Sequence, residues 1–227
     1  MTRTPPSAVL FDLDGTLADT APDLIAALER IRGRLGLPDF DGASLRNVAS
    51  RGAVAILEAG LPELAAADSA RLRADFIEDY RCHCWDRSRP FDGIAELVEA
   101  LEHNGTAWGV VTNKPERLAR EVIERAGWRS RLACLVAGDT AERPKPAPDP
   151  VRMACRMIGV APADTLFVGD DERDVIAGRA AGSQTAAALW GYIDDNESVS
   201  EWRADWIVAS PVELGRELGL LPSRAAV

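Results

Sequence analysis

The sequence contains little cysteine or histidine, and it has no long hydrophobic run. Its 227 residues include four cysteines and two histidines, and we interpret the cysteines as reduced thiols. The one local cluster, Cys82-His83-Cys84, lacks a second ligand pair at zinc-like spacing, so it does not indicate a zinc site. No apolar run approaches the roughly 18 residues of a membrane span, and the first residues lead into a strand with no signal-peptide core. The sequence therefore predicts a cytoplasmic protein without a membrane partner.

Basic residues are also in short supply. The sequence has 26 Lys and Arg residues against 36 Asp and Glu residues, which gives a formal net charge of −10 at pH 7. A protein with this charge is a poor binder of nucleic acid, whose phosphates repel it. If the substrate is anionic, the basic side chains must be concentrated locally. With 47% hydrophobic residues, the chain should form a packed core, and its length suits one larger domain or a smaller domain with an insertion.

Short, continuous apolar runs alternate with helical patterns along most of the chain. These runs are typical of strands covered on both faces, because they do not alternate between polar and apolar residues. The expected strands are residues 8–11, 108–112, 132–137, 165–169, 184–189 and 206–208. The expected helices between them are residues 93–102, 116–126, 150–158 and 174–181. This alternation predicts an α/β fold with a parallel sheet and right-handed crossovers.

Residues 20–88 interrupt the alternation, because they contain helical patterns and no convincing strand. Apolar residues recur there at helical spacing in three separate stretches. A helical insertion directly after the first strand indicates a separate cap over the sheet domain. We therefore predict a core made of residues 1–16 and 89–227 and a helical cap made of residues 17–88.

Polar residues follow the expected strands at the point where each strand ends. Ligands bind at the carboxyl ends of the strands in open parallel sheets, so these residues are expected to converge on one edge. They are Asp12 and Asp14 after the first strand, Thr112, Asn113 and Lys114 after the second, Lys145 after the third, and Asp170, Asp171 and Asp174 after the fourth. Each residue alone is compatible with a helix cap or a turn, but the four strand ends together predict one active site.

The carboxylates predict a site for a hard divalent cation. Asp12 and Asp14 are two residues apart on an extended chain, so they point to the same side and repel each other unless a cation lies between them. Mg²⁺ prefers oxygen ligands, and Asp12 and Asp170 are candidate ligands together with the main-chain carbonyl of Asp14. Lys145 and the Thr112 hydroxyl are then expected to face a phosphoryl group on the other side.

Four ordered motifs resemble those of the haloacid dehalogenase superfamily of phosphatases. They are DLDGT at residues 12–16, TNK at residues 112–114, Lys145, and GDDERD at residues 169–174. The resemblance covers nearly the whole chain and implies a Rossmann-like core with an inserted helical cap. It also implies that Asp12 is the nucleophile, that Asp14 is the general acid/base, and that Mg²⁺ is the cofactor. The implied reaction forms an aspartyl-phosphate that water then cleaves.

The resemblance also implies roles for residues around these groups. Those expected to bind phosphate or substrate are Gly15, Thr16, Asn113 and Lys114. Asp171 and Asp174 are expected to orient the metal site without binding the ion directly. Asp171 departs from the family pattern, which often has Ser or Thr there, and Asp174 is equally suited to capping the following helix.

A narrower resemblance bears on the substrate. DGTLADTAPDL at residues 14–24 looks like the phosphoglycolate phosphatase branch, whereas WGVVTNKP at 108–115, VGDDERD at 168–174 and ALWGY at 188–192 are similar to bacterial N-acetylmuramic acid 6-phosphate phosphatases of cell-wall recycling. We therefore expect a small anionic phosphomonoester, with N-acetylmuramate 6-phosphate ahead of 2-phosphoglycolate. A phosphomutase and a non-catalytic family member are further alternatives. The first usually carries a cap residue pair that we do not find here, and the second is expected to have lost its nucleophile or its motif lysine.

Substrate specificity is expected to come from the cap, which closes over the core edge. A polar, glycine-containing break at residues 47–52 separates two helical stretches of the cap, and a related loop of the family dips toward the active site. Arg51 in this break is our candidate for binding a substrate carboxylate, and the alternative is a solvated arginine at a helix start. Asp19 with Thr20 is expected to cap the first cap helix. The sequence assigns no oligomeric state.

Overall fold

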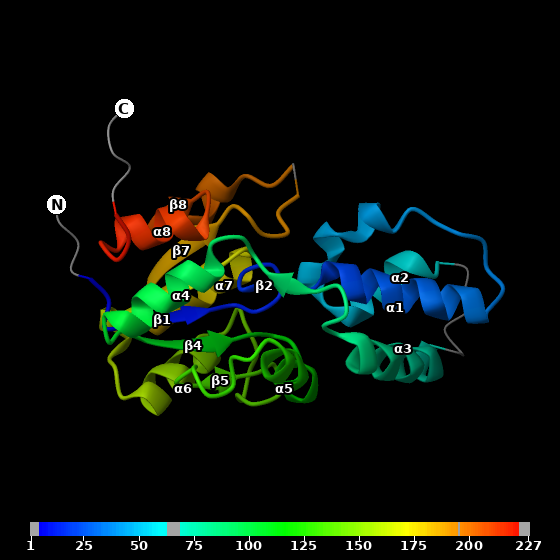
Figure 1. The fold of residues 1–227 in the computed structure, drawn as a ribbon, viewed down its shortest axis with the longest axis horizontal. Helices are drawn as coiled ribbons and strands as arrows, with labels where there is room; N and C mark the ends of the chain where they lie inside the picture. Colours follow the sequence, from blue (N-terminus) through cyan, green and yellow to red (C-terminus); the bar gives the residue numbers. More distant parts are fainter. Residues whose placement is uncertain (1–4, 63–68, 195, 223–227) are drawn as a thin grey trace.

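The computed structural model describes residues 5–62, 69–194 and 196–222. Its core is a six-stranded sheet in which neighbouring strands run parallel, in the order β5-β4-β1-β6-β7-β8 (Figure 1). The strands are β1 (Ala8–Phe11), β4 (Ala107–Val111), β5 (Leu135–Val136), β6 (Thr165–Gly169), β7 (Gln184–Ala188) and β8 (Trp206–Val208). The predicted α/β fold with a parallel sheet is confirmed.

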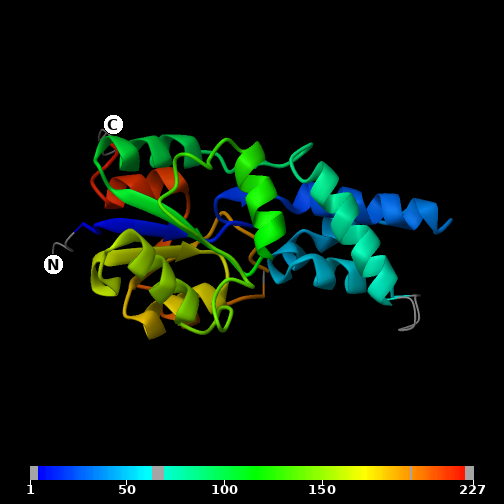
Figure 2. The ribbon, with the colours of Figure 1, turned by 90° about the horizontal axis from the view of Figure 1, so that it is seen from below.

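Helices cover both faces of this sheet, as Figures 1 and 2 show. On one face, α4 (Ile94–His103) packs against α8 (Pro211–Glu217), and on the other α6 (Asp149–Ile158) packs against α7 (Glu172–Ala181). All four residues of β1 are buried, and alternate side chains join the apolar clusters of the two faces. Burial on both faces explains why the strands read as continuous apolar runs.

The observed elements differ from the expected ones mainly at their ends. The core helices, including α5 (Glu116–Arg125), begin and end within two residues of the expected positions. β5 has two residues instead of six, because it is an edge strand and a turn precedes it, in which the Leu132 amide donates to the Trp128 carbonyl at 3.2 Å. The apolar pattern does not predict α8, whose first turn is capped by the Ser210 hydroxyl accepting from the Glu213 amide at 3.1 Å.

The insertion after β1 forms a helical cap. The chain leaves the core through β2 (Ala18–Asp19) and returns through β3 (Arg89–Pro90), and these two short strands pair antiparallel. The cap contains α1 (Ala21–Arg34), η1 (Gly42–Leu45), η2 (Asn47–Arg51), α2 (Ala53–Gly60) and α3 (Ser69–His83). Figures 1 and 2 show these helices beyond the carboxyl ends of the core strands. The polar break before α2 forms a short 3₁₀ helix, η2. Within the described ranges no helix is long and apolar enough to cross a membrane.

The prediction that Asp19 and Thr20 cap α1 is wrong. Thr20 occupies the N-cap position, but its hydroxyl donates to Asp14 Oδ1 at 2.5 Å instead of accepting from the helix. The amides of Thr20 and Ala21 donate to the Tyr192 hydroxyl at 2.7 and 2.9 Å, and that hydroxyl donates to Asp19 at 3.0 Å. Tyr192, a core residue far along the chain, thus accepts hydrogen bonds from the amides at the start of this helix. No local sequence pattern reveals such a contact.

Candidate active site

The turn after β1 places two carboxylates at the edge of the sheet. The backbone of Asp12 still pairs with β6, because its amide donates to a β6 carbonyl at 2.9 Å. After Asp14 the chain folds back, and the Ala18 amide donates to the Leu13 carbonyl at 2.9 Å. Gly15 in this turn has a φ of 87°, a left-handed conformation that glycine adopts without a steric cost. The turn therefore presents Asp12 and Asp14 at the sheet edge and leads directly into the cap.

Lys145 is buried at the centre of the site, where it pairs with two carboxylates. Its Nζ lies 2.9 Å from Asp12 Oδ1 and 2.6 Å from Asp174 Oδ1, and it donates to the Val111 carbonyl at 3.1 Å. Burial by itself lowers the pKa of Lys145, but Asp12 and Asp174 outweigh burial, so its pKa lies above the ordinary value. Lys145 is therefore a fixed positive charge beside Asp12.

Asn113 brings Lys145 to this position. Its side-chain amide donates to the Lys145 carbonyl, and its Oδ1 accepts from the Lys145 amide, both at 2.9 Å. Gly138 permits the close approach of the two loops, because a Cβ there would lie 2.2 Å from the Asn113 carbonyl oxygen. Asn113 also lines the cleft described below, where its predicted contact with substrate stays a prediction.

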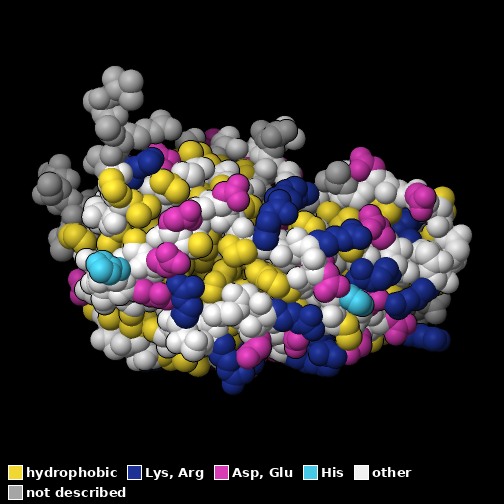
Figure 3. Space-filling view, viewed as in Figure 1, with side chains coloured by type: hydrophobic (Ala, Val, Ile, Leu, Met, Phe, Trp, Pro, Cys, Tyr) yellow, Lys and Arg dark blue, Asp and Glu magenta, His cyan; other side chains and the backbone are white. Residues whose placement is uncertain are grey.

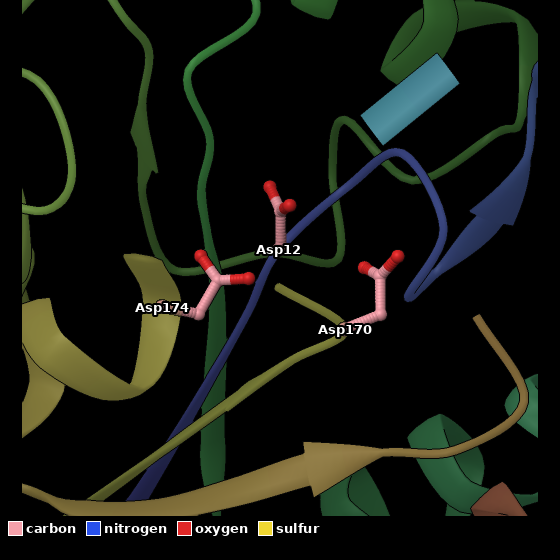
Figure 4. Close-up of side chains that lie close together, drawn as sticks. All are labelled: Asp12, Asp170 and Asp174. Carbon is pink, nitrogen blue, oxygen red and sulfur yellow. The ribbon is translucent and has the colours of Figure 1, made fainter. Parts of the chain in front are cut away.

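Three carboxylates lie together between β1, β6 and α7 (Figure 4). Asp12, Asp170 and Asp174 each offer an oxygen, and these oxygens lie within 4.8 Å of one another. Asp170 and Asp174 are each only 1% exposed. Burial, and then the charges of Asp12 and Asp174, hold the pKa of Asp170 well above its usual range. Burial also raises the pKa of Asp174 to about 7, although Lys145 opposes this shift.

This group fits a hard divalent cation. It consists of oxygen donors, which Mg²⁺ prefers over nitrogen and sulfur. A bound cation would offset the repulsion that raises the pKa of Asp170, and it would keep the carboxylates ionised. Asp12 and Asp170 were predicted as ligands, and the structure places Asp174 in the same group.

Both oxygens of Asp170 are held by the protein. The Thr16 hydroxyl donates to Oδ1 at 2.6 Å, and the Tyr192 amide donates to Oδ2 at 3.0 Å. Gly15 and Gly191 pack so closely that a Cβ there would lie 2.1 Å from Asp170 Oδ2 and 2.2 Å from Asp170 Cβ, respectively. The sequence assigned Gly15 and Thr16 to phosphate binding. In the structure both lie against Asp170 and Thr16 is fully buried, and their predicted contact with phosphate stays a prediction.

Asp171 and Asp174 both cap α7, as the sequence allowed for Asp174, and their role beside the metal site stays a prediction. The Asp171 carboxylate pairs with the Arg173 guanidinium at 2.6 and 2.7 Å and accepts from the Arg173 amide at 2.8 Å, which caps α7. Burial raises the pKa of Asp171, but Arg173 outweighs burial and lowers it. Asp174 accepts from the Asp171 amide at 3.2 Å through one oxygen and pairs with Lys145 through the other. Both residues therefore cap the helix, and Asp174 rather than Asp171 joins the carboxylate group.

The Asp14 carboxylate is joined to the hinge and the cap. Lys114 Nζ lies 2.9 and 3.1 Å from its two oxygens, and the Thr20 hydroxyl donates to it. Lys114 also donates to the Tyr80 hydroxyl of α3 at 2.9 Å. The Thr112 hydroxyl at the end of β4 accepts from the Lys114 amide at 3.2 Å. In this structure the predicted substrate-binding lysine thus holds the candidate acid/base.

A cleft lies between core and cap. Its lining includes the candidate catalytic residues Asp12, Asp14, Thr112 and Lys145. From the cap, Arg51 lines it with a side chain that is 60% exposed and lies 3.6 Å from Asp194. Arg173 donates to the neighbouring Ser50 carbonyl at 3.0 Å and so ties η2 to the core. On the face in Figure 3, Lys and Arg side chains gather over the cap half and the junction, although the net charge is −10.

The fold and the site define a class of protein. A parallel α/β core, a helical cap inserted after β1, and carboxylates that converge with a buried lysine at the sheet edge are the features of a capped phosphoryl-transfer hydrolase. The chain belongs to the haloacid dehalogenase-like hydrolase family, whose model matches residues 9–188. Its enzyme class is that of the phosphatases, the name that its relatives and structural neighbours carry.

The relatives cover nearly the whole chain. The chain is 46% identical over 208 residues to an N-acetylmuramic acid 6-phosphate phosphatase of Pseudomonas aeruginosa, covering 91% of this chain and 92% of the relative. It is 44% identical over 211 residues to a phosphoglycolate phosphatase of Xylella fastidiosa, covering 93% and 92%. The crystal structure of a predicted phosphoglycolate phosphatase from Haemophilus somnus is similar with a TM-score of 0.81 at 25% identity, covering 94% of this chain and 98% of that one.

The sequence did not predict three residues that hold charged side chains of this site in place. Arg173 lies inside the GDDERD motif and Tyr192 inside ALWGY, but a motif does not say which partner a side chain chooses. Tyr80 belongs to the apolar pattern of α3, and no local feature shows that its hydroxyl faces Lys114.

Proposed function

We propose that the chain is a Mg²⁺-dependent phosphomonoester hydrolase that acts through an aspartyl-phosphate. Its proposed substrate is N-acetylmuramate 6-phosphate, and 2-phosphoglycolate is the alternative. The observation that carries the proposal is the convergence of Asp12, Lys145 and Asp174 in one cleft under the cap, with Asp170 in the same group of carboxylates. Mg²⁺, which phosphatases of this family generally use, would be held by Asp12, Asp170 and the Asp14 carbonyl, with Asp174 beside them. The ion supplies positive charge next to the phosphoryl group.

The proposed reaction has two halves. In the first, a carboxylate oxygen of Asp12 attacks phosphorus, the bond from phosphorus to the alcohol oxygen breaks, and the alcohol takes the proton of the Asp14 carboxyl. In the second, water attacks the same phosphorus and gives a proton to Asp14, and the bond from phosphorus to Asp12 breaks to release phosphate. Asp14 must therefore exchange its contacts with Lys114 and Thr20 for contacts with the leaving alcohol and the water.

Lys145 serves both halves. Because its Nζ lies 2.9 Å from Asp12 Oδ1, it pairs with the nucleophile and orients one of its oxygens. Its positive charge also stands where the phosphoryl oxygens gather negative charge during transfer. Thr112, at the end of the neighbouring strand, is the hydroxyl donor on the same side of the cleft.

The lining of the cleft favours a substrate larger than phosphoglycolate. Apolar atoms come from Leu24, Ala53, Pro115 and Leu118. A muramate ring with its acetyl and lactyl methyl groups would pack against them, whereas 2-phosphoglycolate offers a single methylene. The relatives at 43–46% identity carry both names, so similarity alone does not separate the two substrates.

A direct comparison of the two substrates tests the proposal. Phosphate release from N-acetylmuramate 6-phosphate and from 2-phosphoglycolate is measured side by side, with Mg²⁺ and with excess chelator. We expect kcat/KM to favour the muramate by about tenfold or more and both activities to disappear with the chelator. A preference of that size for phosphoglycolate would make it the substrate, and undiminished turnover in chelator would exclude the metal role.

Arg51→Ala is expected to raise KM about tenfold while kcat changes little, because a guanidinium that binds a substrate carboxylate contributes equally to ground state and transition state. The substrates are N-acetylmuramate 6-phosphate and an analogue without the lactyl carboxylate, on which the variant should behave like the unaltered enzyme. Arg71→Ala, an exposed arginine of α3, is the control. An equal rise in KM for both substrates would show that Arg51 does not recognise the carboxylate.

A further inference from the structure

The segment that follows β7 reaches back across the sheet to the turn after β1. Trp190 Nε1 donates to the Thr16 carbonyl at 2.9 Å. A Cβ at Gly191 would lie 2.5 Å from the Gly15 carbonyl oxygen, so only glycine fits there. The Tyr192 amide donates to Asp170 Oδ2 at 3.0 Å. Three successive residues thus contact the site, and none of them belongs to the four motifs.

The side chain of Tyr192 extends from this segment into the hinge of the cap. It is 3% exposed, and its hydroxyl accepts from the Thr20 and Ala21 amides at 2.7 and 2.9 Å and donates to Asp19 Oδ1 at 3.0 Å. A phenolic hydroxyl has one donor and two acceptor positions, so all three are used. The hydroxyl therefore sets the start of α1 relative to the core.

The cap also contacts Tyr192 directly. Arg46, which lies between η1 and η2, places its guanidinium 5.2 Å from the centre of the Tyr192 ring and pairs with Asp19 Oδ1 at 3.0 Å. Asp19 is 4% exposed, and Arg89 of β3 lies 3.9 Å from its other oxygen. These contacts join Arg46 of the cap to Asp19 in the hinge and to Tyr192 in the core.

We propose that Tyr192 is a positioning residue that couples the position of the cap, through the start of α1, to the position of the Asp170 carboxylate. One end of the residue, its amide, holds a carboxylate oxygen of Asp170, and the other end, its hydroxyl, holds the first turn of α1. Closure that brings Arg46 onto the ring and onto Asp19 therefore also fixes the amide against Asp170. The active site is assembled most tightly when the cap is seated over the substrate. The inference rests on the proposed function, because Asp170 is a proposed Mg²⁺ ligand.

Tyr192→Phe tests this coupling, since it removes the hydroxyl and keeps both the amide and the ring. We expect the Kd for Mg²⁺, measured by titration calorimetry without substrate, to rise about tenfold and kcat to fall by a similar factor. Hydrogen exchange at the Thr20 and Ala21 amides should become faster, because both lose their acceptor. Calorimetry reports on Asp170 even if neither proposed phosphomonoester is hydrolysed, so failure of the coupling and failure of the proposed function remain distinguishable.

Thr185→Val is the matched control. It also removes a fully buried hydroxyl that contacts a carboxylate, Asp205 at 3.1 Å, but in β7 away from the cap. Both variants should lower Tm, and only Tyr192→Phe should weaken Mg²⁺ binding. If both variants lower Tm and leave the Mg²⁺ Kd and kcat within about twofold of the unaltered enzyme, Tyr192 has a structural role alone and the proposal is overturned.

Arg46→Met provides a second test that does not depend on a buried position. The Arg46 side chain is 42% exposed, so the variant should fold. Within the described residues, Arg46 pairs with Asp19 and lies over the Tyr192 ring, and no hydrogen bond or ion pair joins it to Asp170. We expect Arg46→Met to raise the Mg²⁺ Kd about threefold in the unaltered enzyme and to have no effect in the Tyr192→Phe background, because coupled residues are not additive. Full additivity of the two substitutions, or an unchanged Kd in Arg46→Met, would contradict the coupling.

Discussion

Replacing Asp12 with asparagine is expected to lower kcat by at least about 10³-fold, on the order of the losses seen when a nucleophile is removed. The amide has nearly the shape of the carboxylate but cannot attack phosphorus. The fold should persist, because Lys145 keeps its contact with Asp174 and with the Val111 carbonyl. The measurement is phosphate release under saturating substrate, with Tm as the check on folding.

Two companion variants make this result specific. Asp86→Asn changes a half-exposed carboxylate that pairs with His83, and it should leave kcat unaltered. With p-nitrophenyl phosphate, whose leaving group departs without a proton from Asp14, Asp14→Asn should still form the phosphoryl-enzyme but lack the base for the second half-reaction. A phosphoryl group should then accumulate on the peptide that contains Asp12 and be visible by mass spectrometry. A kcat for Asp12→Asn within tenfold of the unaltered enzyme, or the phosphoryl group on another residue, would refute the covalent mechanism.

Lys145→Met is expected to lower the free energy of unfolding by about 3–5 kcal/mol without Mg²⁺, since it leaves buried carboxylates without their cation. The Lys145 side chain is 3% exposed and lies between Asp12 and Asp174. Addition of Mg²⁺ should recover part of this loss, because a second positive charge then binds the same carboxylates in the folded state only. The measurement is thermal or denaturant unfolding with and without Mg²⁺.

The pH dependence of this loss follows from Asp174, whose pKa burial raises to about 7. A carboxyl with a raised pKa in the folded state binds its proton more tightly there, so its contribution to stability is largest at low pH and is lost as pH rises through the folded pKa. Lys145 lowers the pKa of Asp174, so its removal makes the ionised Asp174 carboxylate more costly to bury. Lys145→Met should therefore be least destabilised near pH 5 and most destabilised near pH 8, below and above the Asp174 pKa of about 7.

Lys114→Met is the matched variant for this comparison. Lys114 is also buried, with a side chain 5% exposed, but it pairs with Asp14 outside the group of three carboxylates. Lys114→Met should lose less free energy of unfolding than Lys145→Met. Mg²⁺ should stabilise Lys114→Met no more than it stabilises the unaltered enzyme. Equal Mg²⁺ effects in both variants would show that Lys145 does not neutralise the carboxylate group.

Much of this site could be predicted from the sequence because the evidence is local. A continuous apolar run indicates a buried strand, and parallel strands bring their carboxyl ends to one edge. Asp12, Lys145 and Asp170 could therefore be placed together before any coordinates, and the structure brings them into one cluster. The insertion after β1 was equally visible, because helical periodicity replaced the strand pattern over about 70 residues.

The sequence by itself thus determined the α/β core, the place of the cap and which residues reach the sheet edge. Only the tertiary structure decided which partner each side chain takes. Asp174 rather than Asp171 joins the carboxylate group, because the first turn of α7 points it at Lys145 while Arg173 occupies Asp171. Thr16 donates to Asp170 because β1 and β6 are neighbours, and Tyr192 donates to it because the loop after β7 lies against the turn after β1. Such choices depend on which loops meet in space, and secondary-structure periodicity carries no information about them.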